Sequence, residues 1–304
     1  MNFGMHTGDF EKIHKLGAQS NRKFNAVFLV KHKENGISGV YKQLIKTEKN
    51  QHLWSLLRQE TELSFAEREL PQTLAFHENE REIILIRNFK EGVPLSEYWK
   101  QIPKKGKLDF LIQLIEKLIP AFDVLRQNRI VHCDIKPSNI IVSHVNNELQ
   151  VSLIDFGMAV LADKPEERKT LFALGYSAPE LILNKLDLVN QATDIFSLGI
   201  CLWQLFAGKL PLMHPNPGIM TNLQITHPLP ENSSIPRGIY KVLEKMCFKH
   251  SFQLPPNHMK DEEVEIFLRS AMDKRFQNLE EVRDALRGVQ PETGFLAKIR
   301  NKFK

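Results

Sequence analysis

The chain has 304 residues, of which 42% are hydrophobic and 25% are charged, an ordinary globular mixture that excludes a wholly disordered protein. The net charge of +5 is mild and the basic residues are scattered, so a nucleic-acid binder, which would gather them on one face, is not expected. The 3 cysteines, Cys133, Cys201 and Cys247, form no CxxC pair, which excludes a disulfide framework or a cysteine zinc cluster and favours a reducing compartment.

The front of the chain, residues 10–89, has the pattern of a small antiparallel sheet with one helix. Apolar and polar residues alternate in several short runs, and Asn35-Gly36 between two of them is a strong signal for a hairpin turn. Leucines at helical spacing follow. The predicted elements are strands at Phe24–Lys31, Ile37–Leu44, Leu74–Phe76 and Glu82–Arg87 and a helix at Gln51–Glu67.

The rest of the chain, residues 90–290, reads as helical, and the change of character falls near Asn88–Gly92. Met213–Pro236, rich in Pro, Asn and Ser, is expected to be irregular. The expected fold class is α+β, with two lobes: a small antiparallel β-sheet lobe and a larger, mostly helical one. Helices are predicted at Leu108–Leu125, Ile195–Phe206, Arg237–Lys249, Glu262–Ala271 and Leu279–Leu286.

Polar residues with a common chemistry lie in two loops of the helical part. Asp134, Lys136 and Asn139 stand at steps of two and three in one loop, and Asp155 follows the apolar run Val151–Ile154. Loops at the ends of neighbouring strands can converge on one site. Carboxylate and amide oxygens suit Mg²⁺, an acid can orient an attacking hydroxyl, and a lysine can stabilise a transferred phosphoryl group. This set therefore favours phosphoryl transfer.

The order of these residues and of further motifs resembles that of the eukaryotic-type (Hanks-type) serine/threonine protein kinases. The resemblance runs along nearly the whole chain. It implies a protein-kinase fold, ATP and Mg²⁺ as cofactors, and transfer of the γ-phosphate to Ser or Thr hydroxyls of protein substrates. The matching motifs are Val40-Tyr41-Lys42, His132-Cys133-Asp134, Asp155-Phe156-Gly157, Gly175–Glu180, Asp194–Gly199 and Asp273–Phe276.

The resemblance also implies a role for individual residues. Asp134 would be the catalytic base, and Lys136 would contact the γ-phosphate. Lys42 would hold the α- and β-phosphates, with Glu60 from the following helix as its partner and Glu62 as the alternative. Further along the chain, the same resemblance implies structural roles, in which Asp194 braces the catalytic loop and Arg275 pairs with Glu180.

The nucleotide and its metal would be held by a second group of residues. Asn139 and Asp155 would be the Mg²⁺ ligands, and Leu16, Gly17 and Val27 would frame the nucleotide. The family has three glycines in the loop over the phosphates, where the backbone must approach closely, and this chain keeps only Gly17. This departure leaves open the alternative of a catalytically weak pseudokinase that acts as a protein-binding scaffold.

Other departures concern regulation and the class of substrate. Cys133 replaces the arginine that receives an activation-loop phosphate in the family, so we expect activity without phosphorylation of that loop; Thr170 and Ser177 are weak candidate phosphosites. Arg87 stands near the back of the expected nucleotide pocket, where a charge is unusual. A small-molecule kinase of the aminoglycoside phosphotransferase type is disfavoured by Lys136 and by Ala178-Pro179-Glu180.

The expected boundaries are a short extension at 1–9, the two lobes at 10–89 and 90–290, and a basic tail at 291–304. Residues 251–271 look like an insertion that could dock a protein partner. The tail could make a weak membrane contact. No apolar run is long enough to span a membrane and the N-terminus lacks the apolar core of a secretory signal, so a cytoplasmic location is expected.

Overall fold

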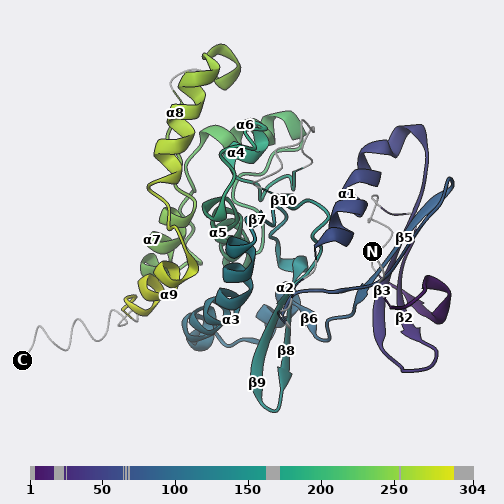
Figure 1. Cartoon of the computed structure of the whole chain (residues 1–304). Helices are drawn as coiled ribbons and strands as arrows, with labels where there is room; N and C mark the ends of the chain where they lie inside the picture. Colours follow the sequence, from purple (N-terminus) through teal and green to yellow (C-terminus); the bar gives the residue numbers. More distant parts are fainter. Residues whose placement is uncertain are drawn as a thin grey trace, which may run out of the picture.

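A computed structural model describes residues 4–16, 24, 26–63, 65, 67, 69–161, 172–252 and 255–290. Figure 1 shows a smaller part, made of strands and one long helix, beside a larger part made mostly of helices. The smaller part comes from the front of the chain, and the larger part from the remainder. The expected α+β, two-lobed architecture is confirmed.

The smaller part is a 5-stranded antiparallel sheet with the strand order β1-β2-β3-β5-β4. Four of the strands were predicted, but β1 was not, because five of its six side chains are exposed and its sequence shows no alternation. The turn between β2 and β3 ends at Gly36, whose φ of +72° favours glycine. The strands are β1 (Phe10–Lys15), β2 (Ala26–His32), β3 (Ser38–Ile45), β4 (Thr73–Glu78) and β5 (Glu82–Asn88).

Helix α1 (Gln51–Glu62) covers one face of this sheet and packs Leu57 against Leu44 and Leu85. It follows the short 3-10 helix η2 (Glu48–Asn50) and ends before the predicted boundary at Glu67. The prediction of a longer helix was wrong because Leu63 adopts an extended conformation and packs into the core of the helical part. Tertiary burial overrides the local helical spacing there.

Two small sheets in the larger part position the loops expected to carry chemistry. Strands β8 (Ile140–Val145) and β9 (Glu148–Leu153) form a hairpin whose turn residues Asn146 and Asn147 both have positive φ, as a two-residue turn of this kind requires. β6 (Val93–Pro94) pairs with β8, and β7 (Ile130–Val131) pairs with β10 (Val160–Leu161).

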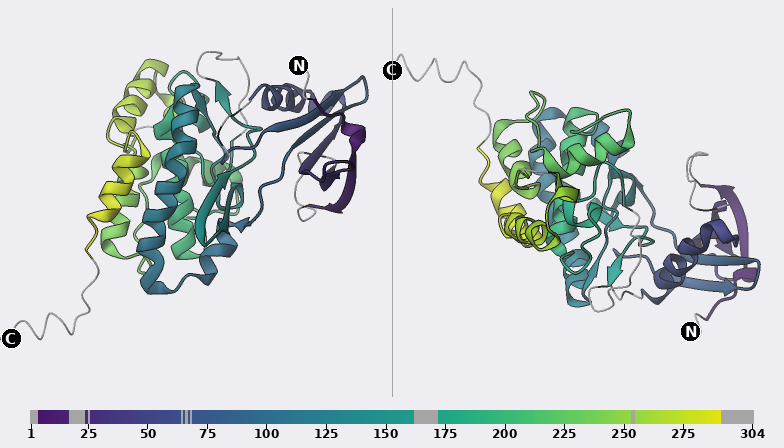
Figure 2. Two further views of the ribbon diagram at one scale, coloured as in Figure 1. Left: turned by 60° about the horizontal axis from the view of Figure 1, so that its bottom comes forward. Right: turned by 90° about the horizontal axis from the view of Figure 1, so that it is seen from above.

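The helical part is organised around α5, which is buried along most of its length, as predicted. In Figure 2, α3 lies along α9, and α5 packs on α7. None of the described helices is both long enough and apolar enough to cross a bilayer. The helices are α2 (Leu95–Tyr98), α3 (Lys107–Gln127), α4 (Pro179–Ile182), α5 (Gln191–Ala207), α6 (Pro217–Thr226), α7 (Arg237–Met246), α8 (Asp261–Met272) and α9 (Leu279–Arg287).

The expectation of an irregular stretch at Met213–Pro236 was wrong for its centre, where α6 forms. The side chain of Asn216 accepts hydrogen bonds from the backbone N–H groups of Gly218 (2.9 Å) and Ile219 (3.2 Å) at the start of the helix. Pro217 occupies the first helical position, where its missing N–H costs nothing. This pair of residues was a helix-start signal that outweighs the local abundance of Pro and Asn.

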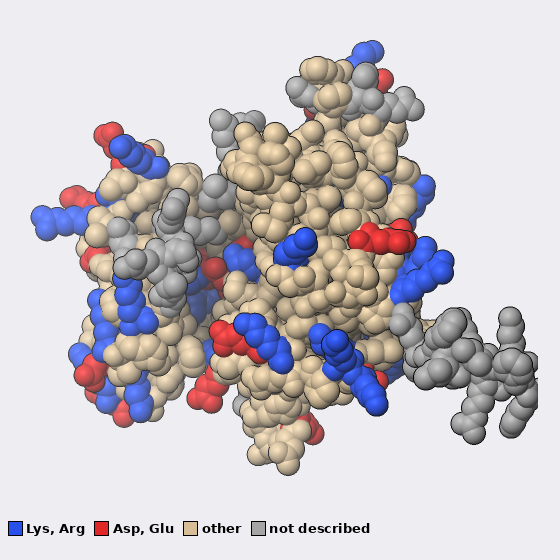
Figure 3. Space-filling view, turned by 180° about the vertical axis from the view of Figure 1, so that it is seen from behind, with Lys and Arg blue, Asp and Glu red and all other residues tan. Residues whose placement is uncertain are grey.

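Helix α8 forms within the expected insertion and lies far from the sheet (Figure 1). Its buried residues Val264 and Leu268 pack in a cluster with Leu188. Ile266, by contrast, is 65% exposed. The described surface carries mixed charge: on the face in Figure 3, Lys and Arg are interspersed with Asp and Glu over both parts.

Candidate active site

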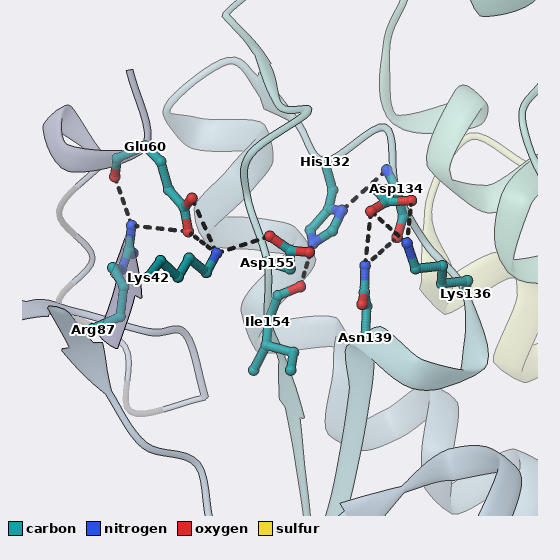
Figure 4. A network of polar contacts seen from close by, with 9 residues as sticks. All are labelled: Lys42, Glu60, Arg87, His132, Asp134, Lys136, Asn139, Ile154 and Asp155. Atoms are coloured by element: carbon teal, nitrogen blue, oxygen red, sulfur yellow. Dashed lines mark hydrogen bonds and ion pairs between the residues drawn. The ribbon is translucent and has the colours of Figure 1, made fainter. Parts of the chain in front are cut away.

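A buried cluster of charges joins the sheet to the helical part. The Nζ of Lys42, on β3, donates to Glu60 Oε1 at 2.9 Å and Oε2 at 3.1 Å, and also to Asp155 Oδ1 at 2.9 Å (Figure 4). Burial alone would lower the pKa of Lys42, but the carboxylates of Asp155 and Glu60 raise it above its ordinary value. Lys42 therefore keeps its positive charge. Its partner on α1 is Glu60, whereas the side chain of Glu62, the alternative partner, is exposed.

The loop between β7 and β8 forms a second polar cluster. Lys136 Nζ donates to both carboxylate oxygens of Asp134, at 2.9 and 2.8 Å. The amide nitrogen of Asn139 donates to the carbonyl oxygen of Asp134 at 2.9 Å and to its Oδ2 at 3.1 Å. In Figure 4 the amide oxygen of Asn139 points away from Asp134.

The β8–β9 hairpin brings the two clusters together. Asn139 immediately precedes β8, and the backbone N–H of Ile154 donates to the carbonyl oxygen of Asn139 at 2.9 Å. Asp155 comes next in the chain, with a φ of +67° that a non-glycine residue rarely adopts. Strain of this kind is typical of functional sites, where the surrounding structure enforces it.

The loop that carries Asp134 is braced by Asp194 at the start of α5, as the resemblance implied. Its carboxylate accepts the backbone N–H groups of His132 at 2.8 Å and Cys133 at 2.9 Å. Burial raises the pKa of Asp194, and these two hydrogen bonds oppose that rise. The bonds hold Cys133 at a φ of +61°. The backbone strain at this turn is thus held by a partner from another element.

His132 fixes the loop from the inside, a role that the sequence did not reveal. Its Nδ1 accepts the backbone N–H of Asp134 at 3.2 Å, so its Nε2 carries the proton and donates to the carbonyl oxygen of Ile154 at 3.0 Å. The ring also packs against Phe156, which in turn contacts Phe65. The loops that carry Asp134 and Asp155 are therefore both hydrogen-bonded to one buried imidazole.

The residues predicted to frame the nucleotide lie around Lys42. The backbone N–H of Leu16 donates to the carbonyl oxygen of Val27 at 2.8 Å, and Val27 is paired with Lys42 across the sheet. The ring of Phe24, which the sequence did not single out, lies 5.3 Å from Lys42 Nζ. Gly17, and with it most of the degraded glycine loop, lies outside the described residues.

The donor set fits Mg²⁺ bound together with phosphate. Within the described part of the chain, no group of three or more His, Cys, Asp or Glu side chains is arranged to hold a metal ion. Asp155 and Asn139 could supply two oxygen ligands of the hard type that Mg²⁺ prefers. Such sites are usually completed by water and by the phosphates of the substrate, which agrees with a metal that arrives with a nucleotide.

The segment before α4 is held rigidly beside this site. Glu180 pairs with Arg275 at 2.6 Å, as predicted. Gln224 of α6 accepts the backbone N–H of Gly175 at 2.9 Å and donates to the carbonyl oxygen of Ser177 at 2.7 Å. Ser177 is buried and donates to the carbonyl oxygen of Ala173, so its hydroxyl is a poor phosphosite in this conformation.

A sheet with a buried Lys–Glu pair, set against a helical part with paired Asp, Lys and Asn residues, defines a phosphotransferase of the two-lobed type. The family model for the protein kinase domain matches residues 10–273. The chain therefore belongs to the protein kinase family.

The chain is also similar to several named kinases. It is 27% identical to Aurora kinase C of Mus musculus over 249 residues, covering 80% of this chain and 86% of that protein. It is 28% identical to the serine/threonine-protein kinase PrkC of Bacillus subtilis over 225 residues and to an Aurora kinase of Eremothecium gossypii over 209 residues. These alignments cover 68% and 67% of this chain, but only 33% and 54% of the relatives.

Proposed function

We propose that this protein is a Mg-ATP-dependent serine/threonine protein kinase. The observation that carries the proposal is a shared hydrogen-bond network. Lys42 bonds to Asp155 at 2.9 Å, and the backbone N–H of Ile154, the residue before Asp155, donates to the carbonyl oxygen of Asn139 at 2.9 Å. Residues from both parts of the molecule are thus set around one place, where a nucleotide phosphate would meet them. The name of PrkC and the lysine at position 136 support Ser and Thr as acceptors.

In this proposal each side chain has a defined task. Asp134 accepts the proton of the substrate hydroxyl as that oxygen forms a bond to the γ-phosphorus and the bond from phosphorus to the leaving diphosphate oxygen breaks. Lys136, which donates to both carboxylate oxygens of Asp134, places its positive charge next to the transferred group. Mg²⁺, when bound by Asp155 and Asn139, would neutralise charge that develops on the phosphates.

A polypeptide substrate would lie along the catalytic loop. A surface cavity of about 350 Å³ opens beside it and is lined by Pro137 and Ser138 of the loop and by Tyr176 of the segment before α4. The same cavity is bounded by Lys100 and Gln204. A groove made by both the catalytic loop and that segment suits an extended chain with a Ser or Thr hydroxyl directed toward Asp134.

We also propose that activity does not depend on a phosphate in the activation segment. Cys133 is buried in an apolar cluster with Val131, Met158 and Leu181, so this position offers no cation to receive a phosphate. Treatment with a protein phosphatase should leave the specific activity unchanged, measured as initial rate on a peptide. A loss of most activity would contradict this part of the proposal. Thr170 lies outside the described residues.

The remaining expectations stay proposals. We propose the division at 1–9, 10–89, 90–290 and 291–304, residues 251–271 as a docking segment for a protein partner, and a reducing, cytoplasmic compartment. Cys133, Cys201 and Cys247 are buried and form no disulfide, which suits such a compartment. The proposed membrane contact of the tail falls on residues outside the described part.

The decisive experiment is phosphate transfer from labelled ATP to a generic protein substrate. Asp134→Asn should lower the rate by about 10²–10⁴-fold, the usual worth of a catalytic base. Asp123→Asn is the matched control, because Asp123 on α3 only pairs with a neighbouring arginine at the surface. If the wild type transfers no phosphate and Mg-ATP does not raise its melting temperature, the scaffold alternative replaces this proposal.

A further inference from the structure

Arg87 is a buried arginine near the end of β5, directly after the apolar run from Ile83 to Ile86. Ile83, Leu85 and Ile86 of β5 are fully buried, and the Arg87 side chain is only 3% exposed. Arg87 pairs with Val40 across the sheet, two residues from the pair of Lys42 with Leu85. Residues two apart on a strand share a face, so Arg87 and Lys42 lie on the same side of the sheet.

The guanidinium of Arg87 hydrogen-bonds to backbone carbonyl groups at and after the end of helix α1. Its Nη1 donates to the backbone carbonyl oxygen of Glu60 at 2.6 Å and lies 3.9 Å from the Glu60 carboxylate. Its Nη2 donates to the carbonyl oxygen of Leu63 at 3.4 Å and to that of Pro71. One side chain therefore contacts α1, the residue after it and the segment that leads to β4 (Figure 4 shows the contacts with Glu60).

The end of α1 needs such a partner. The last four carbonyl groups of a helix accept no hydrogen bond from within the helix. A positive charge near that end stabilises the helix through its dipole. The last turn of α1 contains no basic residue, and the residue after it, Leu63, is extended rather than a glycine cap. Arg87 supplies from β5 both the donors and the positive charge that the helix itself lacks.

The charges around Glu60 balance only when Arg87 is counted. Lys42 is shared between Glu60 and Asp155, so one ammonium faces two carboxylates. Arg87 adds the second cation. Burial lowers the pKa of Arg87, while Glu60 and Asp155 oppose this, and its Nε has no hydrogen-bond partner within the described structure. A buried arginine with an unsatisfied N–H is costly, so stability alone does not explain its presence.

We propose that Arg87 is a positioning residue that holds α1 so that Glu60 stays paired with Lys42 without an external activating signal. This rests on the proposed kinase function, because the pair matters for phosphate transfer only in a kinase. A lysine could not replace Arg87, since a single ammonium lacks the planar fork that reaches several carbonyl groups at once. The device would keep the site assembled in a chain whose Cys133 offers no receptor for a phosphate.

The test compares kcat and KM for ATP in the wild type, Arg87→Met and Arg87→Lys. Arg58→Met is the matched control: Arg58 also joins α1 to the sheet, through Glu78 at 2.9 Å, but it is half exposed and away from Lys42. We expect kcat to fall about 10²-fold in both Arg87 variants, as for a misplaced catalytic group, and less than about 2-fold in Arg58→Met. Arg87→Gln serves if Arg87→Met fails to fold.

A double variant separates positioning from a general structural role. If Arg87 acts through Glu60, adding Arg87→Met to Glu60→Gln should lower kcat by less than about 3-fold further, since the pair is already lost. Amide hydrogen exchange near the end of α1 should be faster in Arg87→Met than in Arg58→Met. An active wild type with unchanged kcat in Arg87→Met, or effects that multiply in the double variant, would overturn the inference. An inactive wild type would instead refute the proposed function.

Discussion

Two of the buried ion pairs in the described part of the chain, Arg275–Glu180 and Lys42–Glu60, differ in how much of their hydrogen-bonding capacity is used. Arg275 and Glu180 are both 0% exposed, and their side chains meet through two hydrogen bonds, at 2.6 and 3.1 Å. The Nε of Arg275 donates to the carbonyl oxygen of Phe248 at 2.9 Å, and Glu180 also accepts the hydroxyl of Thr193. Little hydrogen-bonding capacity is left over for any ligand.

The pair of Lys42 and Glu60 is open by comparison. Lys42 divides one ammonium between two carboxylates, and one of these, Asp155, is 28% exposed. An ammonium is a point charge that can exchange partners, whereas the arginine fork fixes a single geometry. The difference indicates two purposes for buried charge. The Arg275–Glu180 pair, called the saturated pair below, holds the helical part together. The Lys42–Glu60 pair, called the open pair below, leaves Lys42 able to bind a further anion, which suits the proposed function.

The saturated pair should give the largest loss of stability. Glu180→Gln leaves the buried charge of Arg275 without its counter-ion, so the free energy of unfolding should fall by about 3–5 kcal/mol in urea titrations. Glu244→Gln is the control, because Glu244 pairs with Lys241 at the surface and should change stability by less than about 0.5 kcal/mol. If Glu180→Gln lowers the free energy of unfolding by less than about 1 kcal/mol, the two pairs do not differ in this way.

The open pair should instead give a large loss of activity. Lys42→Met should lower kcat by about 10²–10³-fold, the effect of removing one preorganised charge from the transition state. Its effect on unfolding should be smaller than that of Glu180→Gln, because Asp155 reaches solvent and Arg87 remains beside Glu60. Lys31→Met, on the exposed side of β2, provides the control for both measurements. Equal loss of stability in Lys42→Met and Glu180→Gln would contradict this reading.

A pH dependence should mark the surroundings of the saturated pair. Burial lowers the pKa of Lys249 to about 7 in the folded chain, and the nearby charge of Arg275 adds to this. The unfolded chain keeps the ordinary lysine value, so between these two values it binds more protons than the folded chain. Stability should therefore rise with pH above about 7, by at most about 1.4 kcal/mol per pH unit, and show no such slope below it.

Lys249→Met should remove that slope, and thermal or urea unfolding at pH 6.5, 7.5 and 8.5 would measure it. Lys241→Met, an exposed change in the same region, should retain the slope. The prediction fails if the wild type and Lys249→Met show the same dependence of stability on pH.

Local patterns were enough to predict most elements of the fold and to select the motif residues of the candidate site. Lys42, Asp134, Asn139 and Asp155 stand in short motifs whose spacing is visible in the sequence. The end of α1 and the partners of Arg87 were not predictable, because both depend on contacts between segments that are distant in the chain. Helix α6 was not predicted, although Asn216 and Pro217 form a recognisable helix-start signal.

Gln224 links helix α6 to the segment before α4, which lines the proposed peptide groove. The side-chain amide of Gln224 hydrogen-bonds to the backbone of Gly175 and Ser177, on either side of Tyr176. The backbone carbonyl oxygen of Gln224 accepts a hydrogen bond from the ammonium group of Lys249 at 2.5 Å. These hydrogen bonds couple the position of α6 to that of the stretch around Tyr176. Contact with a partner on the outer side of α6, where Ile219 is 45% exposed, would therefore bear on the segment that lines the proposed peptide groove.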